Sequence, residues 1–263
     1  MWEAFTGLIT QILRGIYGFC GDWGLAIIIL TLIVRILIMP LMTKSTKSSA
    51  KMQVLQPQMK EIQDRYADDP QRMQEEMRKF YAENKFNPMG GCLPILLQMP
   101  IFFALFAVIR NIEGLANGAT PSFFNIVPDL TIGPGQIIAA QGLSVEVLTG
   151  AAVYILLDVL FGLLTLVPML LNTQVSTDPA QQRTSRIMGI VMAAWMVWIG
   201  WSLPSGVLLY YVTSALWQVA QQQFVTKRVM AQAKADAEAK MAERPFQVDV
   251  VRKETKKRPH KKS

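Results

Sequence analysis

The sequence predicts an all-α, polytopic membrane protein, and its composition and its apolar runs carry that prediction. Of the 263 residues, 51% are hydrophobic, and the mean hydropathy is +0.27. Charged residues are absent from long blocks and crowded in others, which is typical of a chain that crosses a bilayer several times. Residues 24–41 read GLAIIILTLIVRILIMPL, a run close to the roughly 20 residues that a transmembrane helix needs.

Five apolar segments follow one another along the chain. We expect transmembrane helices at residues 24–43, 92–110, 149–171, 187–202 and 206–225. The last two form a tight hairpin, because Pro204 and Gly206 between them are typical turn residues. The fourth segment is short for a full crossing, so a tilt, a thinner bilayer or a shifted boundary is expected there.

The distribution of Lys and Arg predicts the orientation in the membrane. Residues 44–88 contain nine of them and residues 227–263 contain twelve, whereas residues 1–23 contain only Arg14 and residues 111–148 contain none. Loops rich in Lys and Arg stay in the cytoplasm. We therefore expect the N-terminus outside and the C-terminus in the cytoplasm, as five spans require.

Three units follow from these patterns. Residues 2–17 place apolar side chains on one helical face, so residues 1–22 are predicted to form an amphipathic helix in the outer interface. Residues 23–226 form the five-span core, and residues 227–263 form a basic cytoplasmic tail that begins as a helix.

Residues 48–87, within the core unit, are highly charged and predict a cytoplasmic helical hairpin. Its two apolar faces include Leu55 and Met59 before the DDP turn at residues 68–70, and Met73 and Met77 after it. Sulfur-rich faces adapt to varied partners, so these four residues are candidate contacts for a partner; a solvated structural loop is the alternative. Pro57 is expected to kink the first helix or to mark its start.

Arg35 interrupts the first apolar run. An Arg at the centre of a bilayer costs about 2.5–3.5 kcal/mol even on the lenient insertion scale. The charge therefore needs a hydrated cavity, an anionic partner or a short route to the headgroups. The plainer alternative is that Arg35 lies near the cytoplasmic end of its helix and extends to the interface.

A long motif joins the hairpin to the second span. Residues 87–102 read NPMGGCLPILLQMPIF, which resembles the NP-x-x-GCLP-x-x-x-QMP-x-F signature of YidC-type membrane protein insertases, the YidC/Oxa/Alb family. Residues 34–41 (VRILIMPL) are similar to the family's arginine-bearing first core span, and residues 203–211 (LPSGVLLYY) to the start of its last span. The resemblance covers about residues 20–226 and implies the compact five-span form without a large periplasmic domain.

The resemblance implies an insertase or chaperone of the bacterial plasma (inner) membrane that is not an enzyme and needs no cofactor or metal. Such a protein takes hydrophobic segments and short polar tails of nascent proteins into the bilayer without nucleotide hydrolysis. It does so through a hydrophilic groove, open to cytoplasm and lipid, that contains the arginine, here Arg35. Polar side chains within the spans are the candidates to line this groove; they are Thr31, Gln98, Tyr211, Ser214, Gln218 and Gln221. The alternative for each is a hydrogen bond between helices, worth about 0.6 kcal/mol.

Asp158 is the second charge within a predicted span. It is a candidate charge partner of Arg35, which it would tune toward acidic substrates; alternatively it is protonated or reaches the outer interface. The competing function is an ion or solute transporter that couples Arg35 to Asp158, although the paired repeats of such proteins are missing from these spans. A structural assembly factor is a third alternative. A metal protease or a nucleotide-driven pump is disfavoured, because the sequence lacks HExxH and GxxxxGK[ST], and its only histidine is His260.

The basic tail has two interpretations. Its end is a cluster of cationic side chains, namely Lys256, Lys257, Arg258, Lys261 and Lys262. Such a cluster binds anionic lipid at about 1 kcal/mol per basic residue, or ribosomal RNA by neutralising phosphates. The expected partners are thus nascent membrane proteins and the lipid bilayer, with the Sec translocon and the ribosome as further candidates.

Overall fold

The computed structural model describes residues 2–87, 93–116, 118–142, 144–173 and 179–243. These residues form helices and connecting loops and contain no strand, so the all-α prediction is confirmed. The helices are α1 (Trp2–Cys20), α2 (Trp23–Arg65), α3 (Pro70–Glu83), α4 (Leu93–Arg110), α5 (Ile112–Leu115), α6 (Pro134–Gln141), α7 (Val145–Thr173), α8 (Pro179–Gly200), α9 (Ser205–Gln221), the π-helical turn η2 (Gln222–Thr226) and α10 (Lys227–Glu243).

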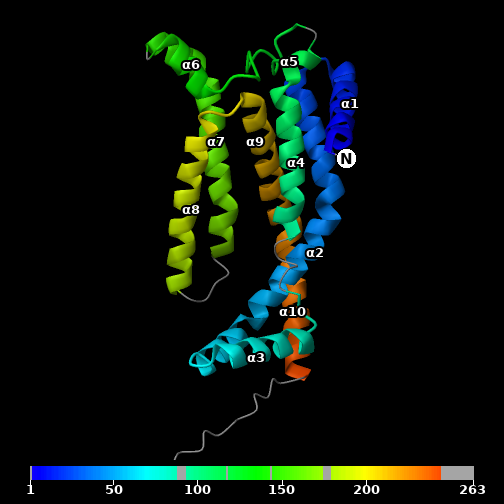
Figure 1. Ribbon diagram of the computed structural model, residues 1–263, viewed down its shortest axis with the longest axis vertical. Coiled ribbons are helices and arrows are strands. Elements are labelled where there is room, and N and C mark those ends of the chain that lie inside the picture. The colour runs from blue at the N-terminus through cyan, green and yellow to red at the C-terminus, as the bar shows by residue number, and fades with distance from the viewer. Residues whose placement is uncertain (1, 88–92, 117, 143, 174–178, 244–263) are drawn as a thin grey trace, which may run out of the picture.

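Within the described residues, two helices are long and apolar enough to cross a membrane. They are α2 and the Val145–Val167 part of α7; Leu96–Arg110 in α4 is a shorter apolar helix. Figure 1 shows α2, α4, α7, α8 and α9 running along the long axis of the molecule. The count of five spans remains a prediction.

Helix α2 is much longer than the predicted first span. Its 43 residues continue without interruption from that span into the first helix of the hairpin. At 1.5 Å per residue it is about 65 Å long, roughly twice the thickness of the hydrocarbon core. Pro40 and Pro57 both lie inside it, so Pro57 does not mark a helix start. Each proline removes a backbone hydrogen bond, and Figure 1 shows α2 changing direction in its lower half.

The upper end of the bundle is closed by the loop between α5 and α6. Helix N-termini leave N–H groups without intrahelical partners. Carbonyls of this loop accept two of them in α9, since the Ser205 N–H donates to the Ile132 carbonyl and the Gly206 N–H to the Leu130 carbonyl, both at 2.9 Å. The side chain of Leu130 is fully buried. Asp22 caps α2 and also accepts the N–H of Phe124 at 2.7 Å, which ties the loop to α2.

The main apolar core lies below this loop, between α2, α4 and α9. Ile27, Ile109 and Val207 come from these three helices and are almost completely buried. Helix α1 adds Leu13 to the same core, which explains why it packs against α2 and α4 (Figure 1). Helices α7 and α8 pack closely on each other, and Trp198 of α8 is 67% exposed. Tryptophan side chains are enriched where a membrane helix meets the membrane–water interface.

The lower end carries a separate apolar cluster between α2 and α3. Leu55, Ile62, Phe80 and Phe86 form its buried centre. The Lys51 ammonium donates to the Asn84 carbonyl, which fastens the end of α3 to α2. Helix α10 packs along α2 near this hairpin (Figure 1).

Candidate functional site

Arg35 is buried in the membrane-spanning half of α2. It is 8% exposed, whereas the next two residues, Ile36 and Leu37, are 55% and 72% exposed. Arg35 therefore points into the helix bundle, and the apolar residues beside it point outward. This burial argues against the alternative in which the guanidinium extends to the headgroups.

Gln218 of α9 is the direct partner of Arg35. With its amide oxygen turned to the guanidinium, the orientation that satisfies both groups, Gln218 accepts hydrogen bonds from Nη1 and Nη2 at 3.0 and 3.2 Å. The amide is neutral, so it accepts from two of the five guanidinium N–H groups without cancelling the charge. Gln218 is itself exposed, which places an accessible polar side chain next to a buried cation.

A second polar pair lies beside Arg35. The amide nitrogen of Gln98, in α4, donates to the Tyr210 hydroxyl at 2.6 Å, and Tyr210 is 2% exposed. The phenols of Tyr210 and Tyr211 both lie within electrostatic reach of the Arg35 guanidinium. The ring of Tyr211 also packs against Phe102 and Phe161, with centroids 5.3 and 4.8 Å away. Arg35 therefore has polar neighbours from α9, and Tyr210 links them to Gln98 of α4.

Tyr210 was absent from the predicted site residues. The signal that could have found it is the spacing of four between Tyr210, Ser214 and Gln218, which puts all three on one face of α9. Ser214 is buried at 2% exposure, one turn after Tyr210.

Two predicted groove residues are engaged elsewhere. Thr31 is fully buried one turn before Arg35, but its hydroxyl donates to the Ile27 carbonyl of its own helix at 2.6 Å. The side chain of Gln221 accepts from the Trp217 ring nitrogen within α9 at 3.1 Å. The structure thus brings Tyr210, Tyr211 and Gln218 near Arg35. Gln98 joins this group through Tyr210, and Thr31 and Gln221 have local partners instead.

Asp158 is fully buried in α7, and both of its carboxylate oxygens lack a hydrogen-bond partner among the described residues. It lies against Gly200 at the end of α8, where an added Cβ would overlap Oδ1 of Asp158. No ion pair joins Asp158 to Arg35 in the described part of the chain. The predicted charge pairing is therefore not formed, because α7 presents this carboxylate to α8.

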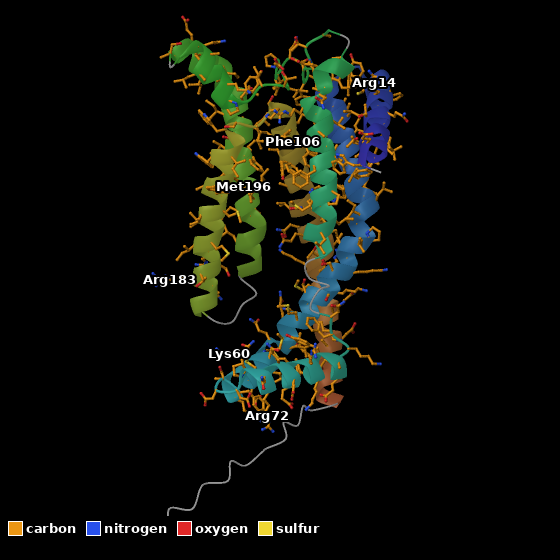
Figure 2. All side chains as sticks on the ribbon, viewed as in Figure 1. Arg14, Lys60, Arg72, Phe106, Arg183 and Met196 are labelled. Carbon is orange, nitrogen blue, oxygen red and sulfur yellow. The ribbon has the colours of Figure 1, made fainter. Side chains whose placement is uncertain are left out.

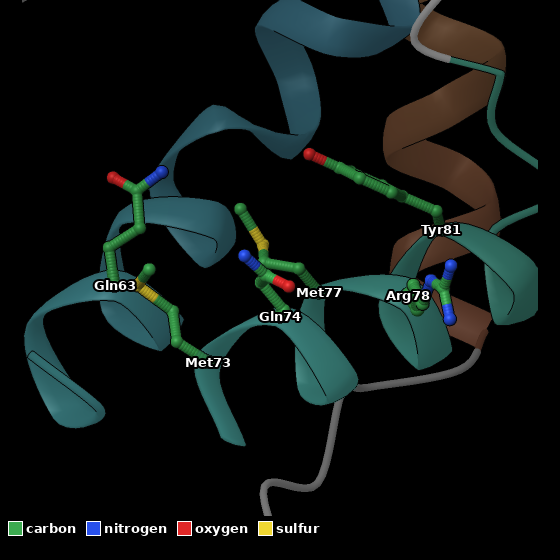
Figure 3. A pocket seen from close by; sticks show the side chains of 6 residues that line it. All are labelled: Gln63, Met73, Gln74, Met77, Arg78 and Tyr81. Atoms are coloured by element: carbon green, nitrogen blue, oxygen red, sulfur yellow. The ribbon is translucent and has the colours of Figure 1, made fainter. Parts of the chain in front are cut away.

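The hairpin separates its predicted contact residues into two groups. Leu55 is 1% exposed at the centre of the α2–α3 cluster, and Met59 packs partly buried against that cluster. Leu55 is therefore unavailable to a partner, which corrects its predicted role, because its side chain holds the two helices together. Met73 and Met77, by contrast, line an open pocket (Figure 3).

The charged end of the tail, with Lys256, Lys257, Arg258, Lys261 and Lys262, lies outside the described residues. Within the described residues, His, Cys, Asp and Glu side chains nowhere gather in the groups of three that could hold a metal ion.

Comparisons with family models, with curated proteins and with solved structures all point to the same family. The family model described as "60Kd inner membrane protein" matches residues 15–233. The chain is 36% identical over 226 residues to the membrane protein insertase YidC of Wolinella succinogenes, an alignment that covers 86% of this chain and 38% of that protein. It is 38% identical over 214 residues to the membrane protein insertase YidC of Haemophilus influenzae, covering 81% of this chain and 35% of that protein.

A solved structure is also similar. The crystal structure of an active YidC insertase with its first transmembrane domain resolved superposes with a TM-score of 0.58 and 30% identity, covering 86% of this chain and 47% of that one. This chain spans less than two fifths of the length of the two curated relatives. On the extent of the family match, the chain belongs to the 60Kd inner membrane protein family, the family of YidC-type membrane protein insertases.

Proposed function

We propose that this protein inserts hydrophobic segments of nascent membrane proteins into the bilayer and guides their short polar tails past Arg35. The observation that carries the proposal is a buried guanidinium whose direct partner, Gln218, is a neutral amide. Relatives named membrane protein insertase give the class of function. We assign the guidance of the polar tail to Arg35 and Gln218.

Electrostatics supports this assignment. A buried cation without an anionic partner attracts an incoming carboxylate, by about 4 kcal/mol at 4 Å for an effective dielectric constant of about 20. That energy is of the same size as the cost of about 2.5–3.5 kcal/mol that a charged side chain such as the incoming carboxylate pays at mid-membrane on the insertion scale, so it offsets that cost. An acidic tail that reaches Arg35 thus gains its counter-ion while still inside the membrane. No covalent step and no nucleotide is needed.

The two ends of the helix bundle differ, and this difference supports a proposal for the side from which a substrate enters. The α5–α6 loop closes the upper end, whereas the exposed side chain of Gln218 gives polar access to Arg35 from α9. Figure 2 shows Lys60, Arg72 and Arg183 in the lower half and Arg14 at the top. We therefore propose that the lower end is cytoplasmic, with the N-terminus outside and five spans, and that the site is a groove open to cytoplasm and lipid.

We also propose that the chain is divided into the three units predicted from the sequence. Residues 1–22 are the interfacial helix, residues 23–226 the core with the hairpin at 48–87, and residues 227–263 the basic tail. The Sec translocon and, through the tail, the ribosome are proposed partners. No observation favours the transporter alternative, since Arg35 and Asp158 form no coupled pair among the described residues.

The test is insertion into liposomes that contain the purified protein, without nucleotide. A small substrate with an acidic outer tail is added, and protection of that tail from protease is measured for wild type, Arg35→Lys, Arg35→Ala and Arg35→Glu. We expect protection with wild type and Arg35→Lys and its loss with Arg35→Glu. Equal protection by all four proteins would remove Arg35 from the proposed function.

A further inference from the structure

The cytoplasmic hairpin contains a pocket that insertion through the Arg35 site does not use. Its volume is about 280 Å³, just below the range of about 300–1,000 Å³ that is typical of small-molecule sites. The lining residues come from α2 and α3 (Figure 3); they are Gln63, Met73, Gln74, Met77, Arg78 and Tyr81. The pocket can hold one or two side chains of an extended segment, but not a whole helix.

The lining determines what chemistry fits. Met73 and Met77 provide flexible apolar contacts, and the Tyr81 ring provides a flat one. Arg78 forms no ion pair with any described residue, although its neighbour Lys79 is paired with Glu76 at 2.7 Å. The pocket therefore suits an apolar side chain that is followed closely by a carboxylate.

A segment of this chain has that chemistry and starts nearby. Helix α10 packs on α2 and ends at Glu243, and both Figure 1 and Figure 3 show its end close to α3. The next eight residues, 244–251, read RPFQVDVV, and no hydrophobic residue follows them in the chain. Phe246 and Val248 precede the carboxylate of Asp249 by three residues and one residue.

The distances allow the contact. Eight extended residues reach about 26–29 Å, whereas the 14 residues of α3 are about 21 Å long. Val248, the fifth residue after Glu243, reaches about 16–18 Å, which is more than the roughly 9–11 Å between Met77 and either end of α3. Because it is tethered, the segment has a high effective concentration at the pocket.

We propose that residues 246–251 of the tail occupy the hairpin pocket, with an apolar side chain between Met73 and Met77 and with Asp249 paired to Arg78. This contact does not involve the Arg35 site. It can therefore be tested separately from the proposed insertion function.

Disulfide crosslinking in the full-length protein tests the placement. In a background with Cys20→Ser and Cys92→Ser, Val248→Cys is combined with Met77→Cys or, as the matched control, with Lys79→Cys two residues further along α3. Met77 and Lys79 lie on different faces of the helix, and Lys79 does not line the pocket. We expect the Met77 pair to crosslink at least fivefold faster within one molecule. Equal rates, or a product that joins two copies, would overturn the proposal.

Charge reversal tests the ion pair in the same crosslinking assay. Arg78→Glu is expected to slow crosslinking of the Met77 pair about two- to fivefold, as for an exposed ion pair. Adding Asp249→Arg should restore the rate. An unchanged rate with Arg78→Glu, or no recovery in the double variant, would refute the pairing of Asp249 with Arg78.

Discussion

Gly200 and Asp158 provide a prediction that depends on close packing between α7 and α8. Changing Gly200 to Ala places a methyl group where Oδ1 of Asp158 lies, with Cγ of the same carboxyl and Cδ1 of Phe161 each 3.1 Å from it. The carboxyl cannot move aside into solvent, because Asp158 is fully buried. Overpacking of this kind costs typically about 1–3 kcal/mol.

The size of the effect follows from the protein's length. A loss of 1 kcal/mol lowers Tm by about 2–4 °C in a protein of 150–250 residues, so a loss of about 1–3 kcal/mol in Gly200→Ala should lower the apparent Tm by roughly 2–12 °C. The matched control is Gly150→Ala in α7, where an added Cβ meets nothing within 4 Å. That control should be neutral or slightly stabilising, since Ala is favoured over Gly in a helix by about 0.8–1.0 kcal/mol.

The assay is thermal unfolding in detergent followed by intrinsic tryptophan fluorescence. A second variant, Asp158→Ala, removes the carboxylate that the new methyl group would strike. In the double-mutant cycle the two substitutions should couple favourably by about 1 kcal/mol or more, because they share one space. A Gly200→Ala protein as stable as wild type, or strictly additive effects, would refute the packing of Asp158 against Gly200.

Three further substitutions test other parts of the structure. Gly24→Ala should destabilise the upper end, since the new methyl group would overlap Phe123, and a drop in apparent Tm would show it. Tyr210→Phe removes the hydrogen bond from Gln98 and should cost about 0.5–1.5 kcal/mol in thermal unfolding; no change would show that the bond is replaced by water. Leu55→Ala should cost about 2–5 kcal/mol within the hairpin, detected as faster proteolysis there, because it leaves a cavity.

The membrane class could be predicted from the sequence, and Arg35 could be selected as a candidate site residue, because a cation stands out in an apolar run whichever way its helix is turned. Gln98 could also be predicted as a polar residue within a span. The spacing of four places Tyr210 on one face of α9 with Ser214 and Gln218, but the sequence does not show whether that face or the face with Tyr211, about 100° away, is the buried one. Here Tyr210 is the buried one that accepts from Gln98.

Other features of the structure could not be predicted from the sequence, because they depend on tertiary contacts. Leu55 and Met73 both lie on apolar faces of the hairpin, but only the packing of α2 on α3 shows that Leu55 is interior and Met73 lines the pocket. The loop that closes the upper end has no periodic pattern, and its structure depends on hydrogen bonds such as Gly206 to Leu130. Likewise, the burial of Asp158 against Gly200 depends on how α7 meets α8.

The most direct test of the central claim exchanges charges between the protein and its substrate. Insertion into liposomes is measured for wild type and Arg35→Glu, each with two substrates that differ only in an acidic or a basic outer tail. We predict that wild type favours the acidic tail and that Arg35→Glu favours the basic one, because the buried charge at this position selects the tail. The same preference in both proteins would contradict the assignment of Arg35 as the working charge of the site.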